Sequence, residues 1–286
     1  MVTVTQHELL GGETQFDQKK KKRQAPASIH TTHKTLTWSF GGGTQSIAIA
    51  WLLALGKLPK PDLIVMSDTG DEATETWEYT FKYTLPLLNS IGLTIELAPA
   101  SQFATVGLYS HKGDLLMPVY TETGKFPTYC STEWKKRVFQ RYIRQVKGIE
   151  TCVTWLGMSA DEIDRIKPSD AQWQQFAWPL AFDVPMTRAE CVQLILNQGW
   201  PHPPKSSCWD CPHRRNPQWL RLKTFYPQDF VKAVWRDKEI RDRDPLHAVY
   251  LHPSRKPLDE VDFTQPDEPL LFGEENGGCH SGFCFV

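Results

Sequence analysis

The sequence of 286 residues lacks any long hydrophobic run. No window approaches the roughly 18 uninterrupted apolar residues of a membrane-spanning helix, and the first residues contain no apolar stretch of the kind that directs secretion. We therefore expect a soluble protein of the cytoplasm with no membrane partner. A strong net charge is also missing, because 32 Lys and Arg residues stand against 33 Asp and Glu residues. No global attraction to nucleic acid is expected, so any such contact must be local.

Two common nucleotide-binding motifs are absent. No Gly-Lys-Ser/Thr follows the glycines at 41–43, which excludes a Walker A loop, and their spacing does not fit Gly-x-Gly-x-x-Gly. The segment at 38–46 instead reads Trp-Ser-Phe-Gly-Gly-Gly-Thr-Gln-Ser, between a predicted strand at 34–38 and a predicted apolar helix at 47–55. Glycine leaves the backbone amides open to a ligand, and the helix N-terminus adds partial positive charge. The glycines therefore indicate one of two things. They form an anion site, such as one for phosphate, or they are only a strand-to-helix turn that needs small residues.

The hydrophobic pattern predicts an α/β fold. Three further strands are predicted, at 63–67, 94–97 and 151–156. A helix is predicted at 74–91, and Pro86 kinks or divides it. Alternating strands and helices are typical of a three-layer sandwich with a mostly parallel sheet and right-handed crossovers. Ligands of such sheets bind beyond the carboxyl ends of the strands, where Asp68 and the glycine turn would both lie.

The chain divides into three predicted regions. Residues 1–33 are polar and form a loosely ordered extension, and their basic run at 19–23 is a solvated tail or an arm that lies on nucleic-acid phosphates. Residues 34–244 form the α/β domain with a C-terminal helical segment that bears cysteines. Residues 245–286 are a proline-rich acidic tail. Helices in the second half of the domain are predicted at 187–198, 219–225 and 230–240.

Seven cysteines are an odd number, and in a reducing compartment they do not suit a disulfide framework. Cys152 and Cys191 lie in apolar runs and are predicted to be packing residues. The other five lie in loops or at helix starts, and they are Cys130, Cys208, Cys211, Cys279 and Cys284. Soft thiolates suit zinc or an iron-sulfur cluster, with His213 or His280 as a nitrogen ligand of zinc. A cluster, zinc and free thiols all stay open.

A basic helix is predicted to begin just after Cys130. Ser131 or Thr132 would cap it, and a thiol at this position has a lowered pKa. The alternative is an ordinary capped surface helix. The basic residues of its first turns are Lys135, Lys136 and Arg137.

Four segments, taken together, resemble the phosphoadenosine phosphosulfate reductase family of the PP-loop, adenine nucleotide alpha hydrolase-like group. They are the PP-loop at 39–46, Asp68-Thr69-Gly70 with Glu75-Thr76-Trp77, Cys130 with Lys135, and Cys208 with Cys211. The resemblance spans roughly 34–230 and implies a PP-loop fold with an adenine-nucleotide site.

This resemblance also implies roles for individual residues. The implied nucleotide-binding residues are Ser39, Phe40, Gly41, Gly42, Gly43, Thr44, Gln45, Ser46, Asp68, Thr69, Gly70, Gly157 and Arg165. The implied catalytic residues are Cys279, Cys284, Asp68 and Lys135. The implied ligands of a [4Fe-4S] cluster, or alternatively of Zn²⁺, are Cys130, Cys208, Cys211 and Cys279.

Several positions depart from the family pattern. Ser131 stands where the iron-sulfur reductases have a second cysteine, and Ser159 stands where reductases have an arginine for the sulfate. ATP-cleaving PP-loop enzymes carry Ser-Gly-Gly-x-Asp-Ser, whereas this chain has Gly41 and Gln45 at two of those positions. Around Cys279 the tail resembles the reductases' nucleophilic C-terminus only in part. Membership of the family is therefore better supported than any one reaction.

Two reactions and one non-catalytic function follow as hypotheses. In the first, ATP with Mg²⁺ at Asp68 and Asp161 activates a substrate as an adenylate, and a thiol or cluster-bound sulfide then delivers sulfur. In the second, Cys279 or Cys284 attacks a phosphosulfate nucleotide, and a thioredoxin-like reductant resolves the product. In the third, the protein is a nucleotide-binding protein with structural zinc. The expected partners are an adenine nucleotide, a sulfur donor or thioredoxin-like reductant, and a nucleic-acid substrate.

Overall fold

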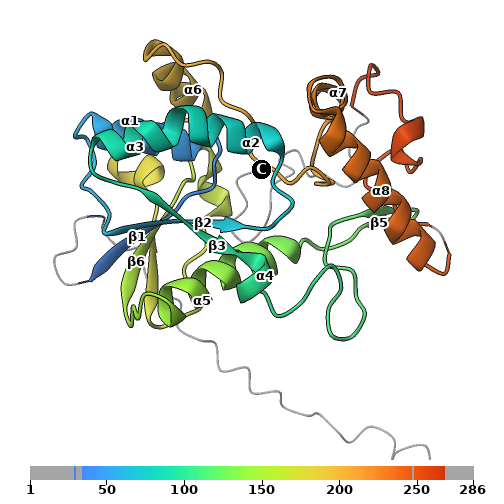
Figure 1. Ribbon diagram of the computed structural model, residues 1–286, viewed down its shortest axis with the longest axis horizontal. Coiled ribbons are helices and arrows are strands. Elements are labelled where there is room, and N and C mark those ends of the chain that lie inside the picture. The colour runs from blue at the N-terminus through green and yellow to red at the C-terminus, as the bar shows by residue number, and fades with distance from the viewer. Residues whose placement is uncertain (1–28, 30–33, 247, 268–286) are drawn as a thin grey trace, which may run out of the picture.

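A parallel β-sheet forms the centre of the protein (Figure 1). The computed structural model describes residues 29, 34–246 and 248–267. The strands of the sheet are β1 (Thr35–Ser39), β2 (Leu63–Asp68), β3 (Ile95–Pro99), β6 (Cys152–Leu156) and β7 (Gln174–Ala177). They stand in the order β3-β2-β1-β6-β7, and every neighbouring pair is parallel. The predicted α/β fold with a mostly parallel sheet is confirmed.

After β3 the chain returns to the opposite edge of the growing sheet. It runs outward from β1 through β2 to β3 and then returns to the other side of β1 for β6 and β7. In open parallel sheets, ligands bind beyond the carboxyl ends of the strands at such a switch of direction. The glycine turn after β1 and the loop after β6 both lie on this edge.

The fifth strand, β7, was not predicted. Its sequence, Gln-Gln-Phe-Ala, has no β-branched residue and no apolar run. It is held by its neighbour β6, where Phe176 pairs with Thr154 and Gln174 Nε2 donates to Thr154 Oγ1 at 2.8 Å. Pairing along the sheet, rather than local pattern, therefore specifies this strand.

Two hydrophobic cores lie on opposite faces of the sheet. Within β2, Ile64 and Met66 join one core and Val65 joins the other, because successive side chains of a strand point to opposite faces. The helices α1 (Thr44–Ala54) and α6 (Arg188–Asn197) cover one face, and α5 (Arg137–Gln145) with the short α4 (Ala100–Phe103) covers the other (Figure 1). Cys152 and Cys191 are fully buried in these cores, which confirms that they are packing residues.

One long helical run follows β2. It consists of α2 (Thr74–Tyr79), a π-helical turn (Thr80–Thr84) and α3 (Leu85–Ser90). Pro86 lies in the first turn of α3, so the predicted division occurs there as a change from π-helix to α-helix. The π-helical turn accommodates the ring and the missing amide of proline without ending the run.

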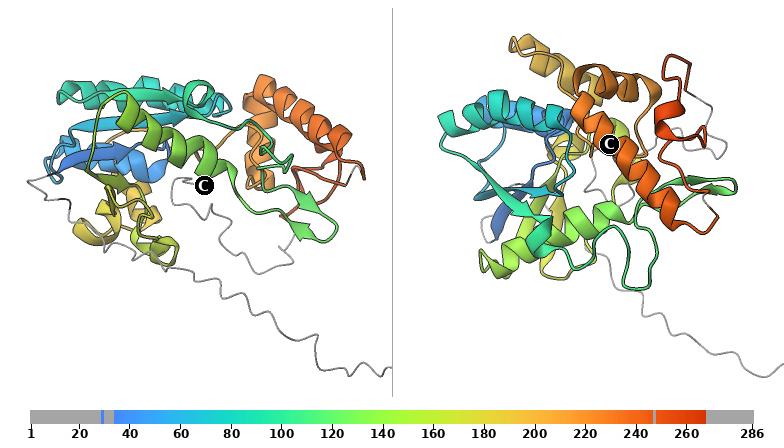
Figure 2. Two further views of the ribbon diagram at one scale, coloured as in Figure 1. Left: turned by 90° about the horizontal axis from the view of Figure 1, so that it is seen from below. Right: turned by 45° about the vertical axis from the view of Figure 1, so that its right-hand side comes forward.

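A second layer of structure lies beyond the carboxyl edge of the sheet (Figure 2). It contains α7 (Asn216–Phe225), α8 (Pro227–Arg243) and a small hairpin of β4 (Tyr120–Thr121) and β5 (Gly124–Lys125). The hairpin was not predicted, and Tyr120 also pairs with Tyr250 of the C-terminal segment. In the described part of the chain, no helix is both long and apolar enough to cross a membrane.

The described part of the C-terminal segment, 248–267, packs against the helices of this layer. Leu251 and Leu258 are fully buried, and Asp237 of α8 accepts hydrogen bonds from the amides of Leu251 at 2.9 Å and Leu258 at 3.1 Å. The segment expected as a tail therefore begins with a packed stretch, while the predicted domain boundaries stay predictions. The basic run at 19–23 lies outside the described residues.

Candidate active site

The glycine turn joins β1 to α1 and is built tightly. Gly42 has φ +70°, a conformation that favours glycine, and a Cβ atom there would lie 2.7 Å from Thr76 Cγ2. Gly41 donates its amide to Ser46 Oγ at 3.0 Å, and Gly43 is the N-cap of α1. The need for glycine at position 42 is thus steric, since α2 packs directly over the turn.

One side of the turn is closed by side chains from the other half of the sheet. Gln45 Nε2 donates to Glu162 Oε2 at 2.8 Å, and Arg188 Nη1 donates to Gln45 Oε1 at 3.3 Å. Gly157 approaches Gln45 so closely that an added Cβ would lie 3.4 Å from its Cβ. Arg165 is ion-paired with Glu162. The predicted residues Gln45, Gly157 and Arg165 therefore come together, but they fill the crevice between β1 and β6, where Thr44, Gln45 and Ser46 are buried.

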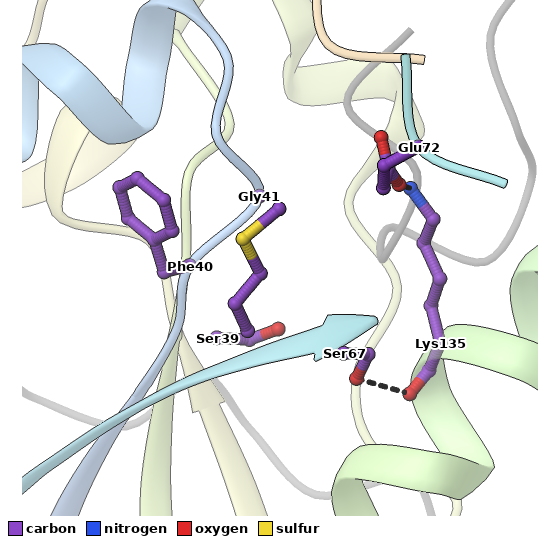
Figure 3. A pocket seen from close by; sticks show the side chains of 7 residues that line it. Ser39, Phe40, Gly41, Ser67, Glu72 and Lys135 are labelled. Atoms are coloured by element: carbon purple, nitrogen blue, oxygen red, sulfur yellow. Dashed lines mark hydrogen bonds and ion pairs between the residues drawn. The ribbon is translucent and has the colours of Figure 1, made fainter. Parts of the chain in front are cut away.

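The other side of the turn borders a small polar pocket between the ends of β1 and β2 (Figure 3). Two of its residues are serines, and Ser67 Oγ donates to the backbone oxygen of Lys135 at 3.0 Å. The pocket is lined by Ser39, Phe40, Gly41, Met66, Ser67, Glu72 and Lys135. Three predicted nucleotide-binding residues and the predicted catalytic Lys135 therefore share one pocket.

A buried ion pair forms the far wall of this pocket. Lys135 Nζ is paired with Glu72 Oε1, and Figure 3 shows the two side chains meeting end to end. The Glu72 side chain is only 1% exposed and that of Lys135 is 12% exposed. Burial of this kind makes the pair sensitive to any charged group that enters the pocket.

The three described candidate ligand cysteines border a second pocket. Thr69 Oγ1 lies 3.6 Å from Cys208 Sγ at its wall. The pocket is lined by Thr69, Met117, Cys130, Ser131, Trp134, Lys135, Ser207, Cys208, Asp210, Cys211, Pro212 and His213. Lys135 thus belongs to both pockets, and the predicted convergence of these thiols on one site agrees with this lining.

The cysteine pocket is electrostatically unusual. Burial raises the pKa of the Cys208 thiol well above its usual value, and the Glu72 carboxylate raises it further. Burial, together with the charge of Asp71, raises the pKa of Asp210 to about 7, against the opposing charge of Arg236. The Arg236 guanidinium lies 3.5 Å from Asp210 and 3.8 Å from Asp71. Burial therefore favours the protonated forms of this thiol and this carboxyl.

A metal site in this pocket would draw on the three thiols. Three thiols around one pocket are a donor set of the soft kind that zinc and iron-sulfur clusters use. In the described ranges, however, no three Cys, His, Asp or Glu side chains are grouped closely enough to hold a metal ion. Cys279, Cys284 and His280 lie outside the described residues. The described residues do not by themselves form a metal site.

Two other predicted features have a structural role. Asp68 ends β2, and its Oδ1 accepts the amide of Gly70 at 2.8 Å, while neither residue lines the two pockets above. Asp161 Oδ1 accepts the amide of Arg188 at 3.0 Å at the start of α6. The expected helix cap at Ser131 or Thr132 is wrong, because Cys130 is itself the N-cap residue and makes no side-chain cap bond.

Sequence reasoning missed Glu72, Asp210 and Arg236. Glu72 follows Asp68-Thr69-Gly70 by two residues, and Asp210 lies inside the Cys208 to Cys211 spacing, so position beside a motif was the available signal. Arg236 lies on α8, far along the chain from either motif, and only the tertiary fold brings it to Asp210.

An open parallel sheet with a polar pocket at its carboxyl edge defines an α/β protein whose candidate ligand site lies beyond the ends of β1 and β2, next to the β1 and β6 switch point where such folds typically bind ligands. No family model matches the chain, and no curated protein matches it. Among solved structures, the chain is similar to the U34-tRNA thiolase NcsA from Methanococcus maripaludis with its [4Fe-4S] cluster. The TM-score is 0.43 at 10% sequence identity, over 76% of this chain and 74% of that chain. A likeness of this extent carries no argument about the activity of the present chain.

Proposed function

We propose that the protein is an adenine-nucleotide-binding enzyme of sulfur chemistry, in which ATP activates an acceptor that then receives sulfur. One observation carries the proposal: Lys135 lines both the pocket at the glycine turn and the pocket of the three cysteines. A nucleotide in the first pocket would therefore lie one side chain away from the thiols. Membership of the phosphoadenosine phosphosulfate reductase family is part of this proposal.

The nucleotide would bind across the carboxyl ends of β1 and β2. Its phosphates belong on the glycine-turn side, because the Lys135 charge on the far wall is already balanced by Glu72. Asp68 is partly exposed at the end of β2, and a carboxylate there suits Mg²⁺, which prefers oxygen ligands. The roles of Gly42 to Ser46 would then be to shape the turn rather than to touch the ligand through side chains.

The chemistry proceeds in two balanced steps. An acceptor oxygen forms a bond to the α-phosphorus of ATP while the bond from that phosphorus to the bridging oxygen breaks, which releases pyrophosphate. Sulfide then forms a carbon–sulfur bond as the carbon–oxygen bond breaks and AMP leaves. Positioning and electrostatic stabilisation supply most of the rate in such reactions. Because the described residues do not form a metal site, neither step is assigned to a cluster or to zinc.

The charges around the site favour this reaction over reduction of a phosphosulfate. The reductive hypothesis needs Lys135, Lys136 and Arg137 to hold the sulfonate. Each of them is already ion-paired within the protein, with Glu72, Asp170 and Glu133 respectively. A sulfonate would have to displace these carboxylates, at a cost that an adenylation reaction does not carry.

To test the proposal, the purified protein is incubated with each kind of substrate in a separate reaction. One reaction contains Mg²⁺, ATP, sulfide and cellular RNA as acceptor, and the other contains adenylyl sulfate or phosphoadenylyl sulfate with a thioredoxin-like dithiol. We expect pyrophosphate in the first and no sulfite in the second. Sulfite without pyrophosphate would replace this function by the reductive one. If neither product forms, the proposal of an enzyme is overturned in favour of a nucleotide-binding protein.

A matched pair of variants locates the site. Lys135→Met should lower the rate of pyrophosphate release at least tenfold, because Lys135 borders both pockets. Lys136→Met is the control, since that lysine pairs with the exposed Asp170, and its rate should stay near that of the wild type. In parallel, we would measure the iron content, the zinc content and the visible absorption of anaerobically purified protein. These measurements decide among a cluster, zinc and free thiols.

A further inference from the structure

Glu72 carries a buried oxygen atom that has no hydrogen-bond partner in the described part of the chain. Oε1 pairs with Lys135, but Oε2 is inaccessible to solvent and makes no hydrogen bond to any described residue. The nearby Ser67 hydroxyl does not donate to it, because Ser67 Oγ donates to the backbone oxygen of Lys135. A buried carboxylate oxygen without a donor is costly and rare in proteins. Glu72 lines the pocket at the glycine turn, so a ligand that enters this pocket and turns the carboxylate toward itself can satisfy this acceptor.

The position of Glu72 is fixed by its backbone. Glu72 forms an antiparallel bridge with Cys208. On either side, the Ala73 amide donates to the Ser207 oxygen at 3.1 Å and the Trp209 amide donates to the Asp71 oxygen at 2.8 Å. This pairing fixes the backbone of Glu72 beside the pocket at the glycine turn, which Glu72 lines.

The chemistry of the wall limits which group can bind there. A phosphate oxygen is an acceptor and carries negative charge, so Glu72 repels it. An amino group can donate to the free oxygen, but it has no acceptor for the Lys135 ammonium. A hydroxyl group donates to a carboxylate and accepts from an ammonium at the same time. A neutral hydroxyl is thus the group that matches the Glu72 and Lys135 pair.

We propose that Glu72 is a specificity-determining residue that accepts a hydrogen bond from a hydroxyl group of the ligand. This inference rests on the proposed function, and for an adenine nucleotide the hydroxyl-bearing part is the ribose. The ribose would lie against the far wall of the pocket, and the phosphates would extend toward the glycine turn. The site would accordingly distinguish ribonucleotides from nucleotides that lack a ribose hydroxyl.

The experiment measures the dissociation constants of ATP, 2′-deoxy-ATP and 3′-deoxy-ATP for the full-length protein by calorimetry. We expect ATP to bind at least tenfold more tightly than one of the deoxy analogues, as for loss of a hydrogen bond to a charged group. In Glu72→Gln, whose neutral amide oxygen is a weaker acceptor, this preference should fall at least threefold. Glu78→Gln is the matched control on the exposed side of α2, and it should keep the full preference.

The outcomes separate the two proposals. Equal affinity of the wild type for all three nucleotides overturns the role of Glu72 and leaves the nucleotide site standing, and this comparison needs no variant to fold. A preference that Glu72→Gln retains in full also overturns it. Failure of every adenine nucleotide to bind overturns the proposed function together with this inference.

Discussion

Gln45 and Glu162 are joined by a hydrogen bond of 2.8 Å between Nε2 and Oε2, although 117 residues separate them along the chain. The bond crosses the gap between β1 and β6, where the sheet changes direction. Ser159 also donates its hydroxyl to Glu162 at 2.9 Å. The crevice at which parallel sheets of this kind hold their ligands is therefore occupied by protein side chains, and the described pocket lies instead between β1 and β2.

Glu162→Ala should destabilise the protein. The substitution removes the charged acceptor of the buried Gln45 amide and leaves it only the longer bond to Ser159 Oγ at 3.4 Å, and loss of the acceptor of a buried donor costs about 1–3 kcal/mol. Urea unfolding followed by tryptophan fluorescence measures the difference. Asp164→Ala, at an exposed position of the same turn, is the control and should change the free energy of unfolding by about 0.5 kcal/mol at most. Equal effects of the two variants would show that the Gln45 bond is unimportant.

Gly42→Ala should be more harmful, because it adds a Cβ 2.7 Å from Thr76 Cγ2 at a residue with φ +70°. The left-handed conformation costs about 1–2 kcal/mol and overpacking about 1–3 kcal/mol. We expect a loss of about 2–5 kcal/mol in the free energy of unfolding. The double variant with Thr76→Ser removes the colliding methyl group and should recover the overpacking part only. A double variant no more stable than Gly42→Ala would contradict the steric account of this turn.

His252 should make stability depend on pH. Burial lowers the pKa of its imidazole from 6.5 to about 4, and the ring lies between Asn216 Oδ1 and Ser254 Oγ, each at 2.7 Å. Between pH 6.5 and pH 4 the unfolded chain binds a proton that the folded protein does not. The free energy of unfolding should therefore fall by about 3 kcal/mol as the pH decreases through this window.

The measurement for His252 compares denaturant unfolding at several pH values in the wild type and in His252→Asn. The difference in stability between the two should shrink as the pH falls from 6.5 to 4, because only the wild type has this titrating ring. His111→Gln, at an exposed position, should keep the wild-type slope. Parallel curves for the wild type and His252→Asn would rule out the assignment.

Asp237→Ala should release the C-terminal segment from α8. The carboxylate accepts the amides of Leu251 and Leu258, so its removal leaves two buried donors unsatisfied, at a cost of about 2–6 kcal/mol. Hydrogen exchange should become faster at these two amides first. Asp242→Ala on the exposed side of α8 should leave both exchange rates unchanged. Unchanged protection in Asp237→Ala would mean that side-chain packing alone holds the segment.

Much of the fold could be predicted because local pattern and tertiary structure agree there. The runs of β1, β2 and β6 are largely buried on both faces, and such runs are distinctive in a sequence. The capping box of α6 could also be predicted from the sequence. In it, Thr187 and Glu190 accept hydrogen bonds from each other's backbone amides. β7 and the hairpin of β4 and β5 were not, because each is specified by a partner strand rather than by its own residues.

For the candidate site, the sequence by itself determined the residue types on which the site draws: the glycine turn, Lys135 and the cysteines. These are local properties, since a turn that needs φ above zero requires glycine wherever it occurs. Only the tertiary structure decided that Glu72 pairs with Lys135, that Gln45 closes the β1 and β6 crevice, and that Cys130 shares a pocket with Cys208. Such contacts join residues far apart in the chain, and the free energy that selects them comes from burial and pairing of charges once the sheet has formed.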